Sequence, residues 1–339
     1  MRTILYGCLQ GKIDASQIYP LFAQRYWHHD GATVSIWGEN QPQLKYFTWF
    51  LLVLFLNLSR LNLILSVIHC LLRTIMPATP SLPFYQVDAF IGPELLGNPA
   101  AVLLVDAFPD EHVMGQIAAE NNLSETVFVQ KQETGFAIRW FTPETEVGLC
   151  GHATLAAAAV LHEQCGELFP LRFHYKSGEL LVEQAGEELA LSLPVELMQK
   201  TAVNQPLCSA LAVSCSEAYA GFYYTLVLSS EAQVREAQPD FSALRQAWPG
   251  GVIITAAADE PGIDFVSRFF APGMGIDEDP VTGSAHCLLA PYWAKHLGKK
   301  QLQALQLSPR GGKLGCEVRG DRVILTGKTK LVIKGEYYL

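Results

Sequence analysis

The sequence predicts an α+β fold that is rich in β-strands. After Met76, short apolar runs typical of strands dominate, and helical spacing interrupts them only briefly. Strands and helices do not alternate regularly, and no G-x-G-x-x-G motif follows a predicted strand, so a doubly wound nucleotide-binding fold is not expected. In addition, two stretches far apart in the chain repeat one order of residue types, which indicates an internal duplication.

Length and charge exclude several classes of protein. The chain has 339 residues, enough for two domains that each bury a core. Its formal net charge is −9, and the Lys and Arg residues are scattered singly, so we expect no nucleic-acid partner. The eight cysteines form no C-x-x-C pair and show no zinc-site spacing to histidine, which argues against a disulfide framework and a structural metal. This pattern fits a reducing compartment, and we expect a cytoplasmic protein.

The first part of the chain differs from the rest. Residues 47–72 are apolar almost throughout but are split by Arg60, which leaves two uncharged runs shorter than the roughly 20 residues that span a bilayer. A secretory signal would stand at the extreme N-terminus instead. We expect residues 1–75 to be either a non-native upstream extension or a membrane-associating leader, with Met76 as a natural start. A membrane partner is not expected unless residues 47–72 are native.

The predicted elements follow from the apolar periodicity. Residues 100–105 ("AAVLLV") form a buried-strand run, and residues 110–122 have helical spacing with an acidic first turn. A second, Ala-rich helix is expected near Ala153. Further strand runs are "ETVFVQ", "FAIRWF", "LRFHY", "GELLVEQ", "ELALSLP", "FYYTLVLS" and "GVIITAA". The closing segment, "DRVILTGKTKLVIKGEYYL", predicts two strands around a Gly-Lys turn.

The repeat joins residues 140–161 to residues 269–293. Both copies contain an aromatic residue, a Phe-x-Pro, an acidic stretch, a small turn with glycine, and an Ala/Leu helix. Gly151 and Gly283 stand at the two helix starts, where unpaired N–H groups and the positive end of the helix dipole bind carboxylates. We expect the two starts to face each other across a cleft and hold a small acidic molecule. An ordinary helix cap is the alternative for each start.

Four motifs give a resemblance to a known family. They are "GNPAAVLL", "NNLSETVFV", "FTPETEVGLCGHATLAAA" and "FAPGMGIDEDPVTGSAHC". Together they resemble the phenazine-biosynthesis (PhzF-like) isomerases, which are related to diaminopimelate epimerase. The match runs from about Phe84 to the C-terminus, and residues 1–75 match nothing in the family.

The resemblance implies an architecture. We expect two similar domains, each a curved β-sheet or barrel wrapped around a central helix, with the active site in the cleft between them. The first domain would span residues 82–194 and regain the C-terminal strand at about residues 329–339, and the second would span residues 195–328. The resemblance also implies a homodimer and a reaction without cofactor or metal.

The resemblance assigns roles to residues in these motifs. Glu125 would be the acid/base that carries the proton, because a carboxyl group in a closed, apolar cleft can hold a proton and return it to a different carbon. His152 and Asp279 would contact the substrate and assist the proton movement.

Four further residues would bind the substrate. Gly151, Gly283 and Ser284 would donate hydrogen bonds to the substrate carboxylate. Asn98 is the fourth candidate, although a loop-forming asparagine before Pro99 is the favoured interpretation of this residue.

Each assignment has a structural alternative. Glu125 could be an acid at an exposed strand edge, and His152 could be a neutral residue at a helix cap. Asp279 precedes Pro280, and Asp-Pro is a common turn former. We expect Asp277 and Glu278 to lie in a solvated loop.

Cys150 raises a second mechanism. In related racemases and epimerases two cysteines face each other across the substrate. Cys150 occupies the first position, but Pro280 falls where the second cysteine is expected, which disfavours a two-cysteine epimerase. Cys287 is expected in the core.

The sequence therefore predicts a cofactor-independent isomerase of a biosynthetic family, which moves a proton on a small carboxylate-bearing substrate. Two alternatives remain open. One is an epimerase or racemase that uses Cys150, and the other is a non-catalytic binding protein on the same fold.

Overall fold

The computed structural model describes residues 81–339, which belong to one compact unit. The prediction that residues 1–75 are an extension or a leader lies outside these residues, as does the apolar segment 47–72. Among the described helices, none has both the length and the hydrophobicity needed to cross a membrane.

The described residues form strands β1–β17, helices α4–α9 and a 3-10 turn. The strands are β1 Ser81–Ile91, β2 Asn98–Val105, β3 Glu125–Gln132, β4 Gly135–Phe141, β5 Glu146–Val147, β6 Leu171–Tyr175, β7 Gly178–Ala185, β8 Glu188–Pro194, β9 Gln199–Thr201, β10 Glu217–Ala220, β11 Tyr224–Val227, β12 Val252–Ala257, β13 Phe265–Ala271, β14 Ile276–Asp279, β15 Gln301–Gln306, β16 Gly312–Arg319 and β17 Arg322–Tyr338. The helices are α4 Glu111–Asn121, α5 Gly151–Cys165, α6 Gln205–Leu211, α7 Glu231–Glu236, α8 Phe241–Ala247, α9 Gly283–Leu297 and the 3-10 turn η2 Pro272–Met274.

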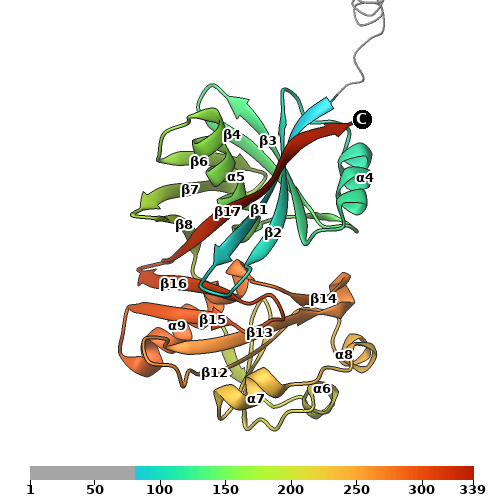
Figure 1. Ribbon diagram of the computed structural model, residues 1–339. Coiled ribbons are helices and arrows are strands. Elements are labelled where there is room, and N and C mark those ends of the chain that lie inside the picture. Colours follow the sequence, from blue (N-terminus) through green and yellow to red (C-terminus); the bar gives the residue numbers. More distant parts are fainter. Residues whose placement is uncertain (1–80) are drawn as a thin grey trace, which may run out of the picture. The chain divides into compact units, whose positions relative to one another are not determined.

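Eight strands close into a barrel around α5, which we call the first barrel. Its order is β17-β1-β2-β3-β4-β6-β7-β8 and back to β17, with parallel pairs at β2–β3 and β4–β6 and antiparallel pairs elsewhere. Helix α5 runs inside it (Figure 1), and residues Gly151 to Leu161 are all buried. The Ala-rich sequence explains this position, because small side chains let a helix fit within a closed barrel.

A second curved sheet, which we call the second sheet, repeats this pattern around α9. Its order is β9-β10-β11-β12-β13-β15-β16-β17. The parallel pairs β11–β12 and β13–β15 correspond to β2–β3 and β4–β6, and the short strand β14 joins β13 as β5 joins β4. The duplication predicted from the sequence is thus present in the strand order, and the predicted fold class is confirmed.

Strand β17 belongs to both sheets. Residues Arg322 to Thr326 pair with β8 on one side and with β16 on the other, and residues Lys328 to Tyr338 pair with β1. The prediction of two strands around a Gly-Lys turn is therefore wrong. Gly327 lies inside one continuous strand, and a Cβ atom there would lie 2.4 Å from the ring of Phe90. Gly327 therefore allows close packing and does not form a turn. The domain boundaries at residues 194 and 328 remain a prediction.

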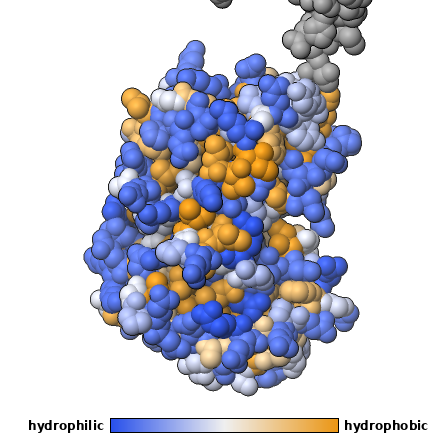
Figure 2. All heavy atoms as spheres, viewed as in Figure 1, coloured by the Kyte–Doolittle hydropathy of each residue, from blue (hydrophilic) through white to orange (hydrophobic). Residues whose placement is uncertain are grey.

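One apolar core joins the two halves. Leu155 of α5 and Leu289 of α9 are fully buried and belong to the same continuous cluster of side chains. Smaller clusters lie beneath α4 and around α6, α7 and α8. On the outside, apolar side chains gather in the middle of the face that β17 crosses (Figure 2), and Val332 and Ile333 of this strand are each 47% exposed. The shared core fixes the two central helices relative to each other.

The starts of the two central helices touch. A Cβ atom built on Gly151 would lie 3.6 Å from the Cα atom of Gly283, and a Cβ atom on Gly283 would lie 3.5 Å from the Cα atom of Gly151. The positive ends of two helix dipoles therefore meet at one point. Either glycine alone leaves space for one added methyl group, because these distances are ordinary van der Waals contacts.

A double-mutant cycle tests this contact. Gly151→Ala and Gly283→Ala should each leave the free energy of unfolding unchanged or raise it by up to about 1 kcal/mol, because alanine favours helix and the new contacts are ordinary. Together they should cost about 1–3 kcal/mol more than their sum, since both methyl groups enter one gap. Urea denaturation measures the coupling. Gly115→Ala in α4, which meets no atom within 4 Å, is the control, and additivity of the pair would contradict the contact.

Candidate active site

Both central helices begin without a side-chain cap. The N-cap residues are Cys150 for α5 and Thr282 for α9, and neither side chain accepts a hydrogen bond from its helix. The shorter helices α6, α7 and α8 do have such caps, whereas α4 does not. Thr282 instead donates its hydroxyl hydrogen to the Asp279 carboxylate. The first N–H groups of α5 and α9 are thus left for another acceptor, and this favours anion binding over an ordinary cap.

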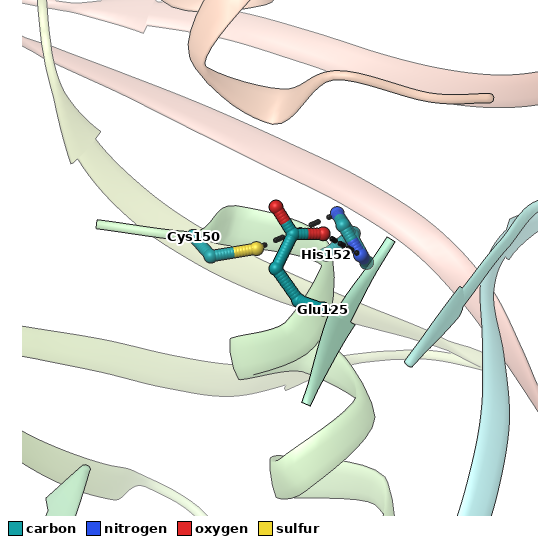
Figure 3. Close-up of side chains that lie close together, drawn as sticks. All are labelled: Glu125, Cys150 and His152. Carbon is teal, nitrogen blue, oxygen red and sulfur yellow. Dashed lines mark hydrogen bonds and ion pairs between the residues drawn. The ribbon is translucent and has the colours of Figure 1, made fainter. Parts of the chain in front are cut away.

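Glu125 lies at the first position of β3, beside the start of α5. Its Oε2 atom is 3.0 Å from Nε2 of His152, and the two side chains are 12% and 4% exposed. The two atoms form an ion pair at this distance, but their geometry is not that of a hydrogen bond, and both are buried without a hydrogen-bond partner. Figure 3 shows the side chains of Glu125, Cys150 and His152 pointing toward one another. Glu125 is therefore not an exposed strand-edge acid, and it retains free hydrogen-bonding capacity.

The other nitrogen of His152 faces two groups. Its Nδ1 atom is 3.1 Å from Nδ2 of Asn98 and 3.5 Å from Sγ of Cys150. Nδ2 of Asn98 also lies 2.8 Å from Oδ1 of Asp279 and 2.9 Å from the Val281 carbonyl oxygen, and its two hydrogens serve these stronger acceptors. The Cys150 thiol then donates to Nδ1 of a neutral imidazole, or accepts from the Nδ1–H of a charged one. Cys150 and Glu125 thus face opposite nitrogens of the His152 imidazole.

The charges around His152 decide its protonation. Burial lowers the pKa of His152, but Cys150 and Glu125 raise it, and the net result is a pKa well above 6.5. Burial and the charge of Glu125 raise the pKa of Cys150 to about 11, so its thiol is neutral near pH 7. The Glu125 carboxylate is consequently the charge that stabilises the imidazolium.

Asp279 comes to the same place from the second sheet, at the end of β14. It is 7% exposed, and burial together with the charge of Glu125 raises its pKa, while His152, Thr282 and Asn98 act in the opposite direction. Its two oxygens accept hydrogen bonds from Asn98 and Thr282. The predicted acid/base group therefore assembles from both halves of the chain.

Tyr223 was not predicted and lies in the site. Its hydroxyl group is 2.9 Å from Oγ of Ser284 in the first turn of α9, and the residue is 8% exposed. Burial raises the pKa of Tyr223 to about 12; the Ser284 hydrogen bond opposes this shift, and the charge of Asp279 supports it. In the sequence this tyrosine stands in an aromatic strand run, where it cannot be distinguished from a core residue.

Two expectations about neighbouring residues are wrong. Asn98 is not a loop asparagine: it is fully buried, begins β2 and contacts His152 and Asp279. Glu278 is not in a solvated loop either, since it lies in β14 and forms a two-oxygen ion pair with Arg268 at 2.7 and 2.9 Å. Asp277 is exposed, but within the same strand. Both predictions failed because the residues that contact Asn98 and Glu278 are not their neighbours in the sequence.

The position facing Cys150 also needs correction. Cys150 and Thr282 are both N-cap residues followed by the glycine that starts a central helix, so Thr282, and not Pro280, is the structural equivalent of Cys150. The second position therefore carries a hydroxyl group bonded to Asp279. Cys287 is 2% exposed and packs in the core.

The same cluster has the composition of a metal site. Glu125, Cys150 and His152 can place one ligand atom each within 4.8 Å of one another. However, the positive ends of α5 and α9 point to this place, and the thiol is neutral, whereas a bound cation prefers a thiolate. The electrostatics favour an anion.

The two best-formed cavities lie away from the site. The two best-formed cavities among the described residues have volumes of about 300 and 250 Å³, and none of the site residues lines either of them. One lies between β1, β2, β3 and the end of α5, and the other lies beside β7 and β8. The side chains of Glu125, His152 and Asp279 are themselves mostly buried, and charge interactions between buried groups are strong.

Comparison with known proteins assigns the family. The family model for phenazine biosynthesis-like proteins (PhzC-PhzF) matches residues 87–335. The chain belongs to this family. An uncharacterized isomerase of Pseudomonas aeruginosa is 45% identical to this PhzF-like chain over 259 residues, which cover 76% of the chain and 99% of the relative. Its name agrees with the expected enzyme class, an isomerase.

Solved structures support the same fold. The crystal structure of a PhzF-family protein from Enterococcus faecalis has a TM-score of 0.73 and 47% identity, and it covers 77% of this chain and 100% of that one. A protein described as a predicted epimerase from P. aeruginosa has a TM-score of 0.62 at 21% identity and covers 76% and 99%. The second similarity concerns the fold alone. The predicted resemblance to PhzF-like isomerases is confirmed.

The imidazole of His152 should titrate abnormally. Because its pKa in the folded protein is raised above 6.5, the stabilisation is complete below pH 6.5 and is lost as the pH rises through the folded-state value. NMR of the imidazole resonances should show a charged ring above pH 6.5. Glu125→Gln should lower this pKa, because it removes the carboxyl group that faces Nε2 of the imidazole. An unchanged pKa in Glu125→Gln would refute the pairing.

Proposed function

We propose that this protein is a cofactor-independent isomerase that moves a proton on a small carboxylate-bearing substrate. The observation that carries the proposal is the meeting of two uncapped helix starts beside the Glu125–His152 ion pair, whose facing atoms have no hydrogen-bond partner. Membership of a family whose relatives are named isomerases supports it.

The helix starts supply the binding site. The free amides of the first turns, which include those of Gly151, Gly283 and Ser284, would donate to the substrate carboxylate, and the positive ends of α5 and α9 would attract its charge. The paired hydroxyl groups of Ser284 and Tyr223 can donate to a neighbouring oxygen of the substrate. Tyr223 remains a neutral donor at physiological pH, because its pKa is about 12.

The acid/base residues supply the chemistry. Glu125 would remove a proton from a carbon near the carboxylate, and the electron pair of the broken C–H bond would be delocalised into the substrate. The helix amides would stabilise the resulting negative charge. Protonated Glu125 would then return the proton to a different carbon, with the His152 imidazolium holding its carboxyl group in place. Asp279, which burial makes easier to protonate, would serve as a second proton store. The reaction needs no oxidant or reductant.

Cys150 does not fit a thiolate mechanism. Its pKa of about 11 leaves it as a thiol near pH 7, and its structural counterpart is Thr282. Its hydrogen bond with His152 instead suits a role in orienting the imidazole.

Replacement of Glu125 tests the chemistry. We expect Glu125→Gln to slow the incorporation of solvent deuterium into an accepted small carboxylic acid by about 100-fold or more, which is the usual contribution of general acid/base catalysis. Mass spectrometry of a panel of unsaturated and hydroxylated carboxylic acids in D₂O measures the rate. Glu120→Gln, an exposed glutamate of α4, is the matched control. Incorporation at the wild-type rate in Glu125→Gln would sink the assignment.

Carboxylate binding can be tested without turnover. Benzoate should raise the melting temperature of the protein, because a ligand that binds only the folded state stabilises it by about 2.7 kcal/mol at 100 times its Kd. Benzamide has a similar shape and no charge, so it should produce no comparable shift. Ser284→Ala should weaken the benzoate effect. An equal response to benzamide would show that the helix starts do not select an anion.

A further inference from the structure

Residues 306–312, which run from the last residue of β15 to the first residue of β16, contact both halves of the candidate site. We propose that Arg310 in this segment is a positioning residue: it fastens the loop before Asn98 to the second sheet, and so sets the distance between Asn98, His152 and Asp279. We call residues 306–312 the latch segment. The inference rests on the proposed function in one respect: it assumes that Asn98, His152 and Asp279 take part in the reaction.

One end of the latch segment holds the first barrel. Arg310 donates from Nε to the carbonyl oxygen of Gly97 at 2.9 Å and from a terminal nitrogen to that of Leu96 at 3.2 Å. In return, the amides of Leu96 and Gly97 donate to the carbonyl oxygens of Arg310 and Gly311, both at 2.9 Å. Four hydrogen bonds thus hold the two residues that immediately precede Asn98.

The other end holds the turn that carries Asp279. The side-chain amide of Gln306, which is 1% exposed, donates to the Asp279 carbonyl oxygen at 2.8 Å and accepts from the backbone N–H of Thr282 at 2.8 Å. Ser308 donates to the carbonyl oxygen of Pro280 at 2.8 Å. Both sides of the site are therefore bonded to one short stretch of chain.

Asn98 itself connects the two sides of the site. Its Nδ2 atom lies within hydrogen-bond distance of His152, Asp279 and the Val281 carbonyl oxygen. If the loop before Asn98 moved away from the latch segment, the hydrogen bond between Asn98 and Asp279 would lengthen first, because these residues come from opposite halves. Small errors in such geometry have large effects on rate.

The partner of Arg310 explains why an arginine stands here. A terminal nitrogen of Arg310 lies 3.0 Å from Oδ2 of Asp88 in β1, whose side chain is 11% exposed. A guanidinium group can reach this carboxylate and two carbonyl oxygens at once, because its five N–H donors form a rigid planar fork. A lysine at this position would keep the ion pair with Asp88 but would lose the planar set of donors that bonds the two carbonyl oxygens.

Solvent exchange measured by NMR tests the proposal in the whole protein. In Arg310→Gln and Arg310→Lys, the amide of Gly97 and the side-chain NH₂ of Asn98 should exchange with solvent at least tenfold faster than in the wild type, with amides of β12 unchanged. Arg319→Gln removes an exposed arginine that pairs with Glu317 and is the matched control. The same two Arg310 variants should lower the rate of deuterium incorporation into substrate and leave benzoate binding nearly unchanged.

The outcomes are distinct. Exchange at the wild-type rate in Arg310→Gln would overturn the proposal, because it would show that Arg310 does not hold the loop before Asn98. Exchange at the wild-type rate in Arg310→Lys would also overturn it, because it would show that only the charge pair with Asp88 matters. Faster exchange at β12 as well would also overturn it, since that result indicates a general loss of stability. The exchange measurement needs no substrate, so failure of the proposed reaction would not affect it.

Discussion

The contact between Gly151 and Gly283 is the constraint on which the rest of the site depends. Each helix start presents a glycine at this contact, and the two dipoles place their positive ends at one point. Such an arrangement is unfavourable by itself. Negative charge nearby relieves it, and the carboxyl groups of Glu125 and Asp279 lie in its surroundings. A bound carboxylate would do the same more directly, because it could accept hydrogen bonds from the open amides.

The first barrel and the second sheet hold the helix starts in this position. Helix α5 is enclosed by eight strands, α9 packs on β15, β16 and β17, and both helices share one apolar core. Strand β17 pairs with β8 and β16 along the same residues, which ties the first barrel to the second sheet by backbone hydrogen bonds. Covalent continuity, strand pairing and the shared core all act against separation of the helix starts.

Polar groups in the site are buried without being fully satisfied. Oε2 of Glu125, Nε2 of His152 and Oδ1 of Asn98 have no hydrogen-bond partner, although such groups are costly to bury. In contrast, the groups that support them are well bonded, as the contacts of Gln306 and Arg310 illustrate. Unsatisfied atoms at the centre and satisfied atoms around it are the pattern of a site prepared for a ligand.

The sequence by itself determined the elements, the duplication and the motif residues. Periodicity located α4 and most strands, and the repeated order of Phe-x-Pro, acids and glycine marked both helix starts, because these signals depend on neighbours within one turn or one strand. It could not place Asn98, Glu278 or Tyr223. Those assignments depend on partners such as Asp279, Arg268 and Ser284 that lie 10 to 181 residues away. Only tertiary structure brings these side chains together, because hydrogen bonding and burial depend on distance in space and leave no local periodicity in the chain.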